Sequence, residues 1–278
     1  MTATALIASD LDRTLIYSHR FFHTDSNGAT CVETLDGEQI SFMTPPAISA
    51  LEQLASRQVV VPATTRTVAQ YQRIALPGGP YRFAVTSNGG TILVDGQPDP
   101  GWSATVAAAV AAGGITLEEV MVALHARISD TWVRSVKTAE DLFCYLVVDE
   151  AAMPADFVKS WQHWCAPRGW KVSQQGRKVY TVPRSLCKSH AVQEVRRRLT
   201  ATGELAADAP VLAAGDGALD AELLVAADAA IRPSHGELHA LGWQTEGLTV
   251  TAAHGAGAAE EILAWFHARS AAHNAQAL

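Results

Sequence analysis

The first residues that could do chemistry are two carboxylates near the start of the chain. Asp10 and Asp12 follow the apolar run 3–9, which predicts a short buried strand. A carboxylate that attacks phosphorus needs a second group to protonate the leaving oxygen and later to deprotonate water. Asp10 fits the attacking group and Asp12 fits the acid and base. Two acids in an ordinary surface turn would have the same spacing.

A second pair of acids follows a later apolar run. Asp216 and Asp220 come after the predicted strand 211–214, and the glycines beside them, Gly215 and Gly217, permit close approach of the backbone. Carboxylate oxygens gathered near a phosphate suit Mg²⁺, which binds through few carboxylates, water and the phosphate itself. Gly-Asp-Gly is also a common turn, so this motif alone leaves a structural role open.

Two further residues have chemistry that suits a phosphate. Lys188 begins the predicted helix 188–200, where the helix dipole disfavours a cation. A bound phosphate would explain a lysine there, and a solvated lysine is the alternative. Thr64 ends the predicted strand 59–64, and ligands of open parallel sheets bind outside the carboxyl ends of the strands.

Strands and helices alternate in the two outer parts of the chain. This order implies right-handed βαβ units on a parallel sheet. A hairpin is also predicted, around the turn Asp36-Gly37. The strands are predicted at 3–9, 59–64, 82–86, 211–214, 229–232 and 248–251, and the helices at 45–58, 67–76, 188–200, 220–226 and 258–268.

The pattern changes at about residue 91 and returns after Pro183. The middle part combines helices with adjacent strands, which are expected to pair antiparallel. Helices are predicted at 103–112, 117–128 and 155–165, and strands at 131–136, 142–148, 170–173 and 178–182. We therefore predict an α/β fold: a Rossmann-like parallel-sheet core made of residues 1–88 and 184–278, interrupted by an α+β cap domain at 89–183.

The order of these motifs resembles that of haloacid dehalogenase (HAD) superfamily phosphatases. The motifs are Asp10-x-Asp12-x-Thr14, Ala63-Thr64-Thr65-Arg66, Lys188 and Gly215-Asp216-x-x-x-Asp220. An insert after Thr86-Ser-Asn88-Gly-Gly is similar to the large α/β cap of the Cof-type and sucrose-phosphatase-like branch. The resemblance spans nearly the whole chain, and it implies the same Rossmann-like core with its inserted cap.

The resemblance implies a role for each acid. Asp10 would attack phosphorus and bind Mg²⁺, and Asp12 would be the general acid and base while its backbone carbonyl binds the metal. Asp216 would be the other protein ligand of Mg²⁺. Asp220 would steady the metal-bound waters or Lys188. The expected metal ligands are therefore Asp10, Asp12 and Asp216, with Asp220 in the shell around them.

The resemblance also implies binding roles for four other residues. Thr64 and Lys188 would bind the oxygens of the transferring phosphoryl group. Arg66 and Asn88 lie near the junction with the cap, where contacts with the rest of the substrate are expected. The chain departs from the family pattern at Arg13, where many members have glycine. It departs again at residue 219, a leucine where this branch often has asparagine, and in a long segment before Pro45.

These residues predict a Mg²⁺-dependent phosphomonoesterase that hydrolyses a small phosphorylated metabolite, a sugar phosphate, through an aspartyl-phosphate intermediate. Two alternatives stay open. A phosphomutase would share the fold and the acids, but it would move phosphate between two hydroxyls of one sugar and exclude water. A regulator that binds a sugar phosphate without catalysis would not need Asp12, whose role is proton transfer.

Composition excludes several other classes of protein. The net charge of −7 argues against general nucleic-acid binding, since the largest basic cluster is only Arg196 to Arg198. The first residues have neither a basic leader nor an apolar run long enough for a membrane span, so we expect a cytoplasmic protein with no membrane partner. Four scattered cysteines without a Cys-x-x-Cys pair suggest neither zinc nor disulfides. The oligomeric state is left open.

Overall fold

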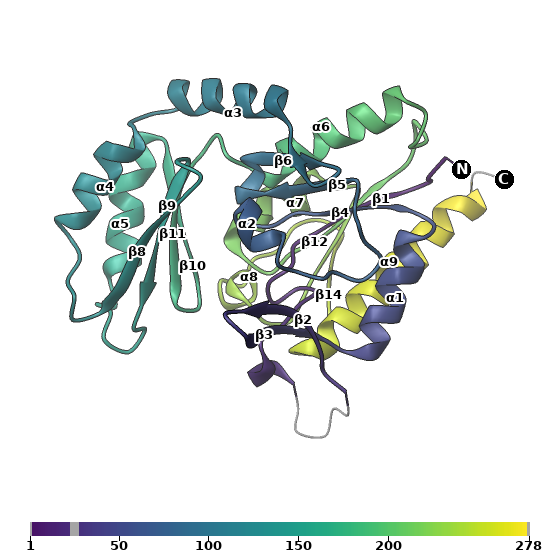
Figure 1. Cartoon of the computed structure of the whole chain (residues 1–278), viewed down its shortest axis with the longest axis horizontal. Helices are drawn as coiled ribbons and strands as arrows, with labels where there is room; N and C mark the ends of the chain where they lie inside the picture. The colour runs from purple at the N-terminus through teal and green to yellow at the C-terminus, as the bar shows by residue number, and fades with distance from the viewer. Residues whose placement is uncertain (1, 23–27, 277–278) are drawn as a thin grey trace.

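A five-stranded parallel sheet forms the centre of the larger of two bodies that lie side by side (Figure 1). The computed structural model describes residues 2–22 and 28–276. In spatial order the strands are β14 (Leu248–Val250), β13 (Ala229–Arg232), β12 (Val211–Ala214), β1 (Leu6–Ser9) and β4 (Val59–Pro62). The α/β class and the parallel sheet predicted from the sequence are confirmed.

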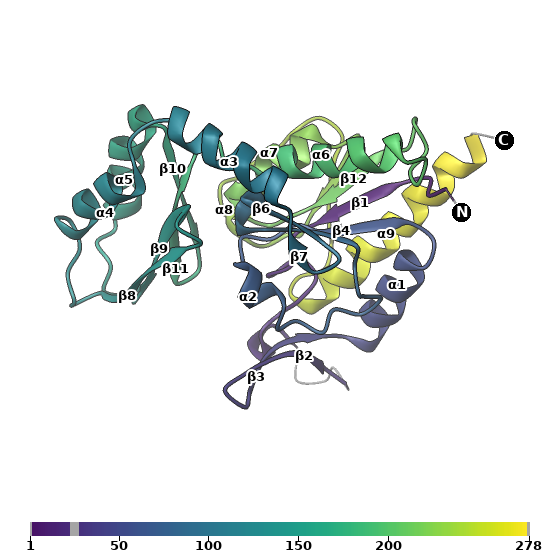
Figure 2. The same cartoon turned by 45° about the horizontal axis from the view of Figure 1, so that its top comes forward.

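Helices cover both faces of this sheet, which explains why its strands are mostly apolar. Successive side chains of a strand point to opposite faces. Ile7 therefore packs toward one helical layer, and Leu6 and Ala8 pack toward the other. The first layer holds α1 (Pro45–Ala55) and α9 (Ala256–Gln276), which lie side by side in Figures 1 and 2, and the second holds α6 (Lys188–Ala201) and α7 (Ala221–Ala226).

One predicted strand of the parallel sheet lies outside it. β5 (Phe83–Thr86) touches β4 through a single parallel bridge and instead pairs antiparallel with β6 (Thr91–Val94), which β7 (Gln97–Pro98) extends. The chain reverses because Ser87 and Asn88 adopt positive φ angles of 50° and 56°. Segment 82–86 therefore lies parallel to the end of β4, as predicted, but its main pairing is in a separate antiparallel sheet.

The predicted hairpin is present as β2 (Thr30–Leu35) and β3 (Glu38–Met43). It also shortens a helix. The pattern predicted a helix over 67–76, but α2 covers only Val68–Tyr71 because the Ala75 N–H donates to the Val32 carbonyl of β2 at 2.7 Å. A contact distant in sequence thus overrides local helix propensity.

The smaller body is built on an antiparallel sheet. Two fully buried tryptophans, Trp161 and Trp170, lie in its core. Figure 2 shows α3 (Pro100–Ala112) running between the two bodies. In spatial order the strands of this sheet are β10 (Trp170–Gln175), β11 (Lys178–Pro183), β9 (Phe143–Val148) and β8 (Val133–Ala139). The helices of the smaller body are α4 (Leu117–His125) and α5 (Phe157–Cys165).

Two carboxylates hold the smaller body against the larger one. Glu140, in the turn after β8, accepts hydrogen bonds from Ser87 and Thr91 at 2.6 and 2.9 Å. Glu237 begins the short helix α8 (Glu237–Ala240) and accepts from Ser173 Oγ of β10 at 2.6 Å. It also accepts from the backbone N–H of residue 218 at 2.9 Å, so one side chain joins β10 to the loop after β12.

The division into a core of 1–88 and 184–278 and a cap of 89–183 stays a prediction. We propose that the first crossing lies nearer residue 99, because β6 and β7 pair with β5 rather than with the smaller sheet. Over the described residues, no single helix is long and apolar enough to cross a membrane. α3 and α4 would meet that test only as a pair bent by 57°.

Candidate active site

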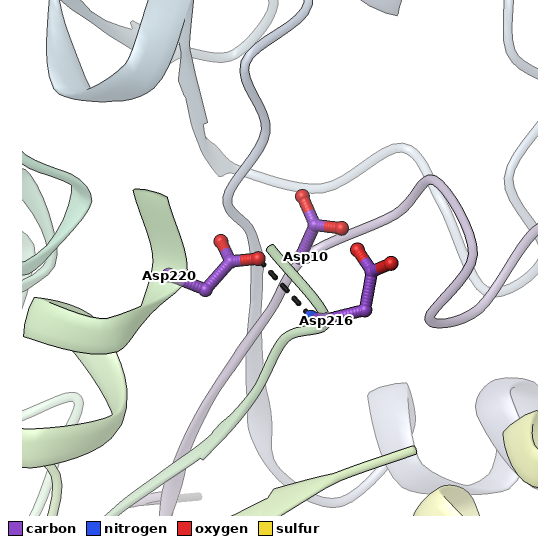
Figure 3. Close-up of side chains that lie close together, drawn as sticks. All are labelled: Asp10, Asp216 and Asp220. Atoms are coloured by element: carbon purple, nitrogen blue, oxygen red, sulfur yellow. Dashed lines mark hydrogen bonds between the residues drawn. The ribbon is translucent and has the colours of Figure 1, made fainter. Parts of the chain in front are cut away.

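The acids chosen from the sequence meet at one edge of the parallel sheet. β1 and β12 run parallel, so the residues after them emerge on the same side, and the Asp10 N–H donates to the Ala214 carbonyl at 2.9 Å. Figure 3 shows the carboxylates of Asp10, Asp216 and Asp220 close together. One oxygen from each lies within 4.8 Å of the others.

Lys188 lies among these acids and is completely buried. Its Nζ donates to Asp10 Oδ1 at 2.7 Å and to Asp220 Oδ1 at 2.5 Å. Burial alone would lower the pKa of Lys188, but the two carboxylates raise it, so the ammonium stays charged. The predicted association of Asp220 with Lys188 is present in this geometry.

Two glycines make room for the acids. A Cβ at position 215 would collide with the Asp220 side chain, and at position 236 it would lie 2.5 Å from Asp216 Oδ2. Gly236 also has φ +90°, a conformation that other residues rarely adopt. Because Gly215 has no side chain, Asp220 can lie close to the backbone, and its Oδ2 accepts hydrogen bonds from the N–H groups of Asp216 and Gly217 at 3.1 and 2.9 Å. Both oxygens of Asp220 are therefore occupied.

Among these acids, the negative charge of Asp216 has the weakest contacts with donors and cations. Its Oδ2 is buried and has no hydrogen-bond partner among the described residues. The nearest cation is the Arg13 guanidinium, with Nε 3.7 Å away. Burial and the neighbouring carboxylates raise the pKa of Asp216 well above its usual range, and burial raises that of Asp10 to about 7 in spite of Lys188. Lys188 and Arg13 therefore do not offset all the negative charge of this cluster.

Asp12 is held differently from the other acids. Arg66 binds it with two hydrogen bonds, Nε to Oδ2 at 2.7 Å and Nη2 to Oδ1 at 2.8 Å. Burial would raise the pKa of Asp12, but the Arg66 charge outweighs it and lowers the pKa to about 2. Water screens part of this effect, because the Asp12 side chain is 37% exposed. Asp12 is therefore an anion in this arrangement.

Sequence reasoning missed Glu33, which holds Arg66 from the other side. Arg66 Nη1 lies 2.7 Å from Glu33 Oε1, and Glu33 also accepts from Ser41 Oγ at 2.6 Å and Arg73 Nη2 at 3.2 Å. Its side chain is completely buried although it belongs to β2. The hairpin was predicted, but nothing in its sequence indicated that it would contribute to the site.

A cavity of about 340 Å³ opens beside Asp12, and we call it the Asp12 pocket. Its lining comes from four parts of the chain: the motif after β1, residues 16–21 with β3, the loop after β4, and the β9 to β11 region of the smaller body. The lining residues are Asp12, Arg13, Ile16, Ser18, Arg20, Phe21, Ile40, Ser41, Arg66, Val147, Gln175, Gly176, Arg177, Lys178 and Tyr180.

The remaining predicted site residues occupy different places. Arg66 lines the Asp12 pocket, as a substrate-binding residue would. Asn88 is fully buried and does not line it; its side-chain N–H donates to the Leu186 carbonyl at 3.1 Å and ties together the two crossings between the bodies. Thr64 is also fully buried, and its Oγ1 accepts the backbone N–H of Arg66 at 3.1 Å.

Comparison with known proteins identifies the fold. No family model and no curated protein matches the sequence. A sucrose-phosphatase from Synechocystis, solved with sucrose and phosphate, matches 96% of this chain and 99% of its own, with TM-score 0.63 and 16% identity. A Thermoplasma acidophilum protein matches 95% and 99%, with TM-score 0.60 and 15% identity. A sugar phosphatase of HAD subclass IIB matches 96% and 100%, with TM-score 0.56 and 13% identity.

These matches extend over almost the whole chain, and two of the three matched proteins are a sucrose-phosphatase and a sugar phosphatase of HAD subclass IIB. The chain therefore has the HAD phosphatase fold, a Rossmann-like core with an inserted α/β cap. The resemblance seen in the sequence motifs is confirmed at the level of the fold.

Proposed function

We propose that this protein is a Mg²⁺-dependent phosphatase that hydrolyses a small phosphorylated metabolite, a sugar phosphate, through an aspartyl-phosphate on Asp10. The observation that carries the proposal is the buried group of Asp10, Lys188 and Asp216 at the carboxyl edge of the parallel sheet. The solved sugar phosphatases of the same fold support the substrate class.

The residues present fit a divalent cation. Asp10, Asp216 and Asp220 are buried together with only Lys188 as a buried cation beside them, and Asp216 Oδ2 has no hydrogen-bond partner in the part of the chain described. Asp10 and Asp216, with the Asp12 carbonyl, would hold Mg²⁺, while Asp220 is already occupied by Lys188 and backbone N–H groups. The ion would supply positive charge for the phosphoryl oxygens.

The first step joins an Asp10 carboxylate oxygen to phosphorus as the bond from phosphorus to the ester oxygen breaks. Lys188, already 2.7 Å from Asp10 Oδ1, can contact the oxygens of the transferring group. Asp12 gives its proton to the leaving oxygen. In the second step Asp12 takes a proton from water, which attacks phosphorus and releases phosphate and free Asp10.

The ion pair between Arg66 and Asp12 favours the second step and opposes the first, because it keeps Asp12 ionised. An ionised Asp12 is ready to take the proton from water, but it must first carry a proton to donate in the first step. A phosphate dianion near Asp12 raises the pKa of that carboxyl by repulsion and also attracts the Arg66 guanidinium. We therefore expect substrate binding to loosen the contact between Asp12 and Arg66.

The test is phosphate release by purified protein with Mg²⁺ from a panel of sugar phosphates and from 4-nitrophenyl phosphate. Wild type should release phosphate, and Asp10→Asn should release none while it still folds and binds the ester, because only the nucleophile is lost. Turnover by Asp10→Asn at the wild-type rate would refute the covalent mechanism. Isomerisation of a sugar phosphate that depends on a bisphosphate and releases no phosphate would instead identify a mutase.

A further inference from the structure

The Asp12 pocket carries more positive charge than the rest of the molecule leads one to expect. The chain as a whole has a net charge of −7. Among the described residues, Asp12 is the only acid that lines this pocket, and it is already bound to Arg66. The basic residues that line it are Arg13, Arg20, Arg66, Arg177 and Lys178. Such a concentration of cations in a cavity attracts anions.

Two of these five cations are engaged by acids of the reaction centre. Arg66 binds Asp12 and Glu33, and Arg13 faces Asp216. The other three, Arg20, Arg177 and Lys178, form no ion pair with a carboxylate of the described residues. Lys178 lies 5.9 Å from the centroid of the Tyr145 ring.

The chemistry at Asp10 does not need these three cations. The acids there are Asp10, Asp12, Asp216, Asp220 and Glu33, and the cations that oppose them are Lys188, Arg13, Arg66 and Arg73. Mg²⁺ and a phosphate dianion would add charges that cancel each other. The five acids then exceed the four cations by one charge, so at least two of the three remaining cations are not needed to balance the centre.

Their position shows which part of a substrate they would meet. Asp12 marks the place of the leaving oxygen, because it must protonate that atom. Lys178 lines the same cavity as Asp12, so its ammonium lies in the space next to the leaving oxygen. Arg177 is exposed in the turn between β10 and β11, and the Arg20 guanidinium lies 4.9 Å from the centroid of the Phe21 ring, on the part of the wall that the larger body supplies. The cations therefore surround the space for the leaving group.

We propose that the leaving group is itself anionic: the preferred substrate is a phosphate ester with a second phosphate or a carboxylate on the part that leaves. Arg177 and Lys178 bind this second anion, with Arg20 across the pocket. The inference rests on the proposed phosphatase function and narrows its substrate class. Each charge-assisted hydrogen bond to the second anion contributes about tenfold in affinity.

The test compares esters that differ in the second anion. Fructose 1,6-bisphosphate is paired with fructose 6-phosphate, and 6-phosphogluconate with glucose 6-phosphate, so the two pairs separate a second phosphate from a carboxylate. Wild-type kcat/KM should favour the doubly anionic member of at least one pair by about tenfold or more. This ratio should fall as salt concentration rises.

Arg177→Gln and Lys178→Gln should each reduce that ratio by about tenfold. Residue 177 lies in an exposed turn, so its replacement should not disturb folding. The matched control is Arg134→Gln, which also removes a cap arginine, but one that pairs with Asp149 at 2.5 Å and does not line the pocket. The control should leave the ratio unchanged.

Equal kcat/KM within both pairs, or the same ratio in Arg177→Gln, Lys178→Gln and Arg134→Gln, would overturn the proposal. Calorimetric binding of the same four compounds to Asp10→Asn with Mg²⁺ tests the pocket without turnover. Failure of every ester to release phosphate would refute the phosphatase function. Tighter binding of the doubly anionic compounds would in that case still support the pocket assignment.

Discussion

The hairpin carboxylate Glu33 gives the sharpest test of how the site is supported. Its side chain is completely buried and receives hydrogen bonds from Arg66, Arg73 and Ser41. Glu33→Gln keeps the shape but removes the charge. Breaking a buried ion pair by removing one partner costs about 3–5 kcal/mol. Because Arg66 keeps its contact with Asp12 and Arg73 is partly exposed, we expect a smaller loss, about 2–3 kcal/mol.

For a chain of this size such a loss lowers the melting temperature by about 4–10 °C, which thermal unfolding followed by circular dichroism measures. Activity should fall as well, by up to about 10²-fold in kcat, because Arg66, which binds Asp12, loses the Glu33 contact that holds it in place. KM should change little, since Glu33 does not line the Asp12 pocket.

The matched control is Glu38→Gln, which removes an exposed acid from the same hairpin. Its melting temperature and kcat should equal those of wild type. If Glu33→Gln melts at the same temperature as this control, the buried ion pair does not stabilise the fold. If Glu33→Gln raises KM while kcat is unchanged, Glu33 does not act through Asp12.

Two further predictions concern the acids. Asp12→Asn should lower kcat for a sugar phosphate by about 10² to 10⁴, the usual worth of a positioned acid or base. With 4-nitrophenyl phosphate, whose leaving group needs no proton, a hydroxylamine-labile phosphoryl adduct on Asp10 should accumulate in Asp12→Asn, and its absence by mass spectrometry of quenched samples would contradict the role of Asp12. Asp216→Asn should melt at a higher temperature than wild type in a chelator, because it removes an uncompensated buried charge. Mg²⁺ should raise the melting temperature of wild type and not of the variant, and an equal shift in both would remove Asp216 from the metal site.

The sequence alone determined the sheet, the insert and the acids at the sheet edge. The strands of the parallel sheet are short apolar runs because both faces are covered by helices, and this pattern is readable in one dimension. Asp10 and Asp216 follow two such runs, so a parallel sheet was enough to predict that both acids lie at its carboxyl edge. The structure adds that β1 pairs directly with β12. Lys188 was recognised because a cation at a helix start is unusual.

The tertiary structure decided which of these groups are engaged and by what. The sequence contains no sign that Glu33 holds Arg66, because this contact joins segments 33 residues apart through a buried ion pair and not through any periodic pattern. For the same reason helix 67–76 was predicted too long, since the Ala75 N–H donates its hydrogen bond to β2 and not to a carbonyl of the helix. Local patterns record which face of an element is buried, but they do not record its neighbour.

The Asp12 pocket is the clearest case of this difference. Arg20 and Arg177 are separated by most of the chain, and each by itself is an ordinary surface arginine. The packing of the smaller body against the larger one, through Glu140 and Glu237, brings them to one cavity. Charge acts through space, so the electrostatic character of a site between two bodies is fixed by how they pack. The sequence determined the phosphate chemistry to expect, and the tertiary structure determined the charge that lines the Asp12 pocket.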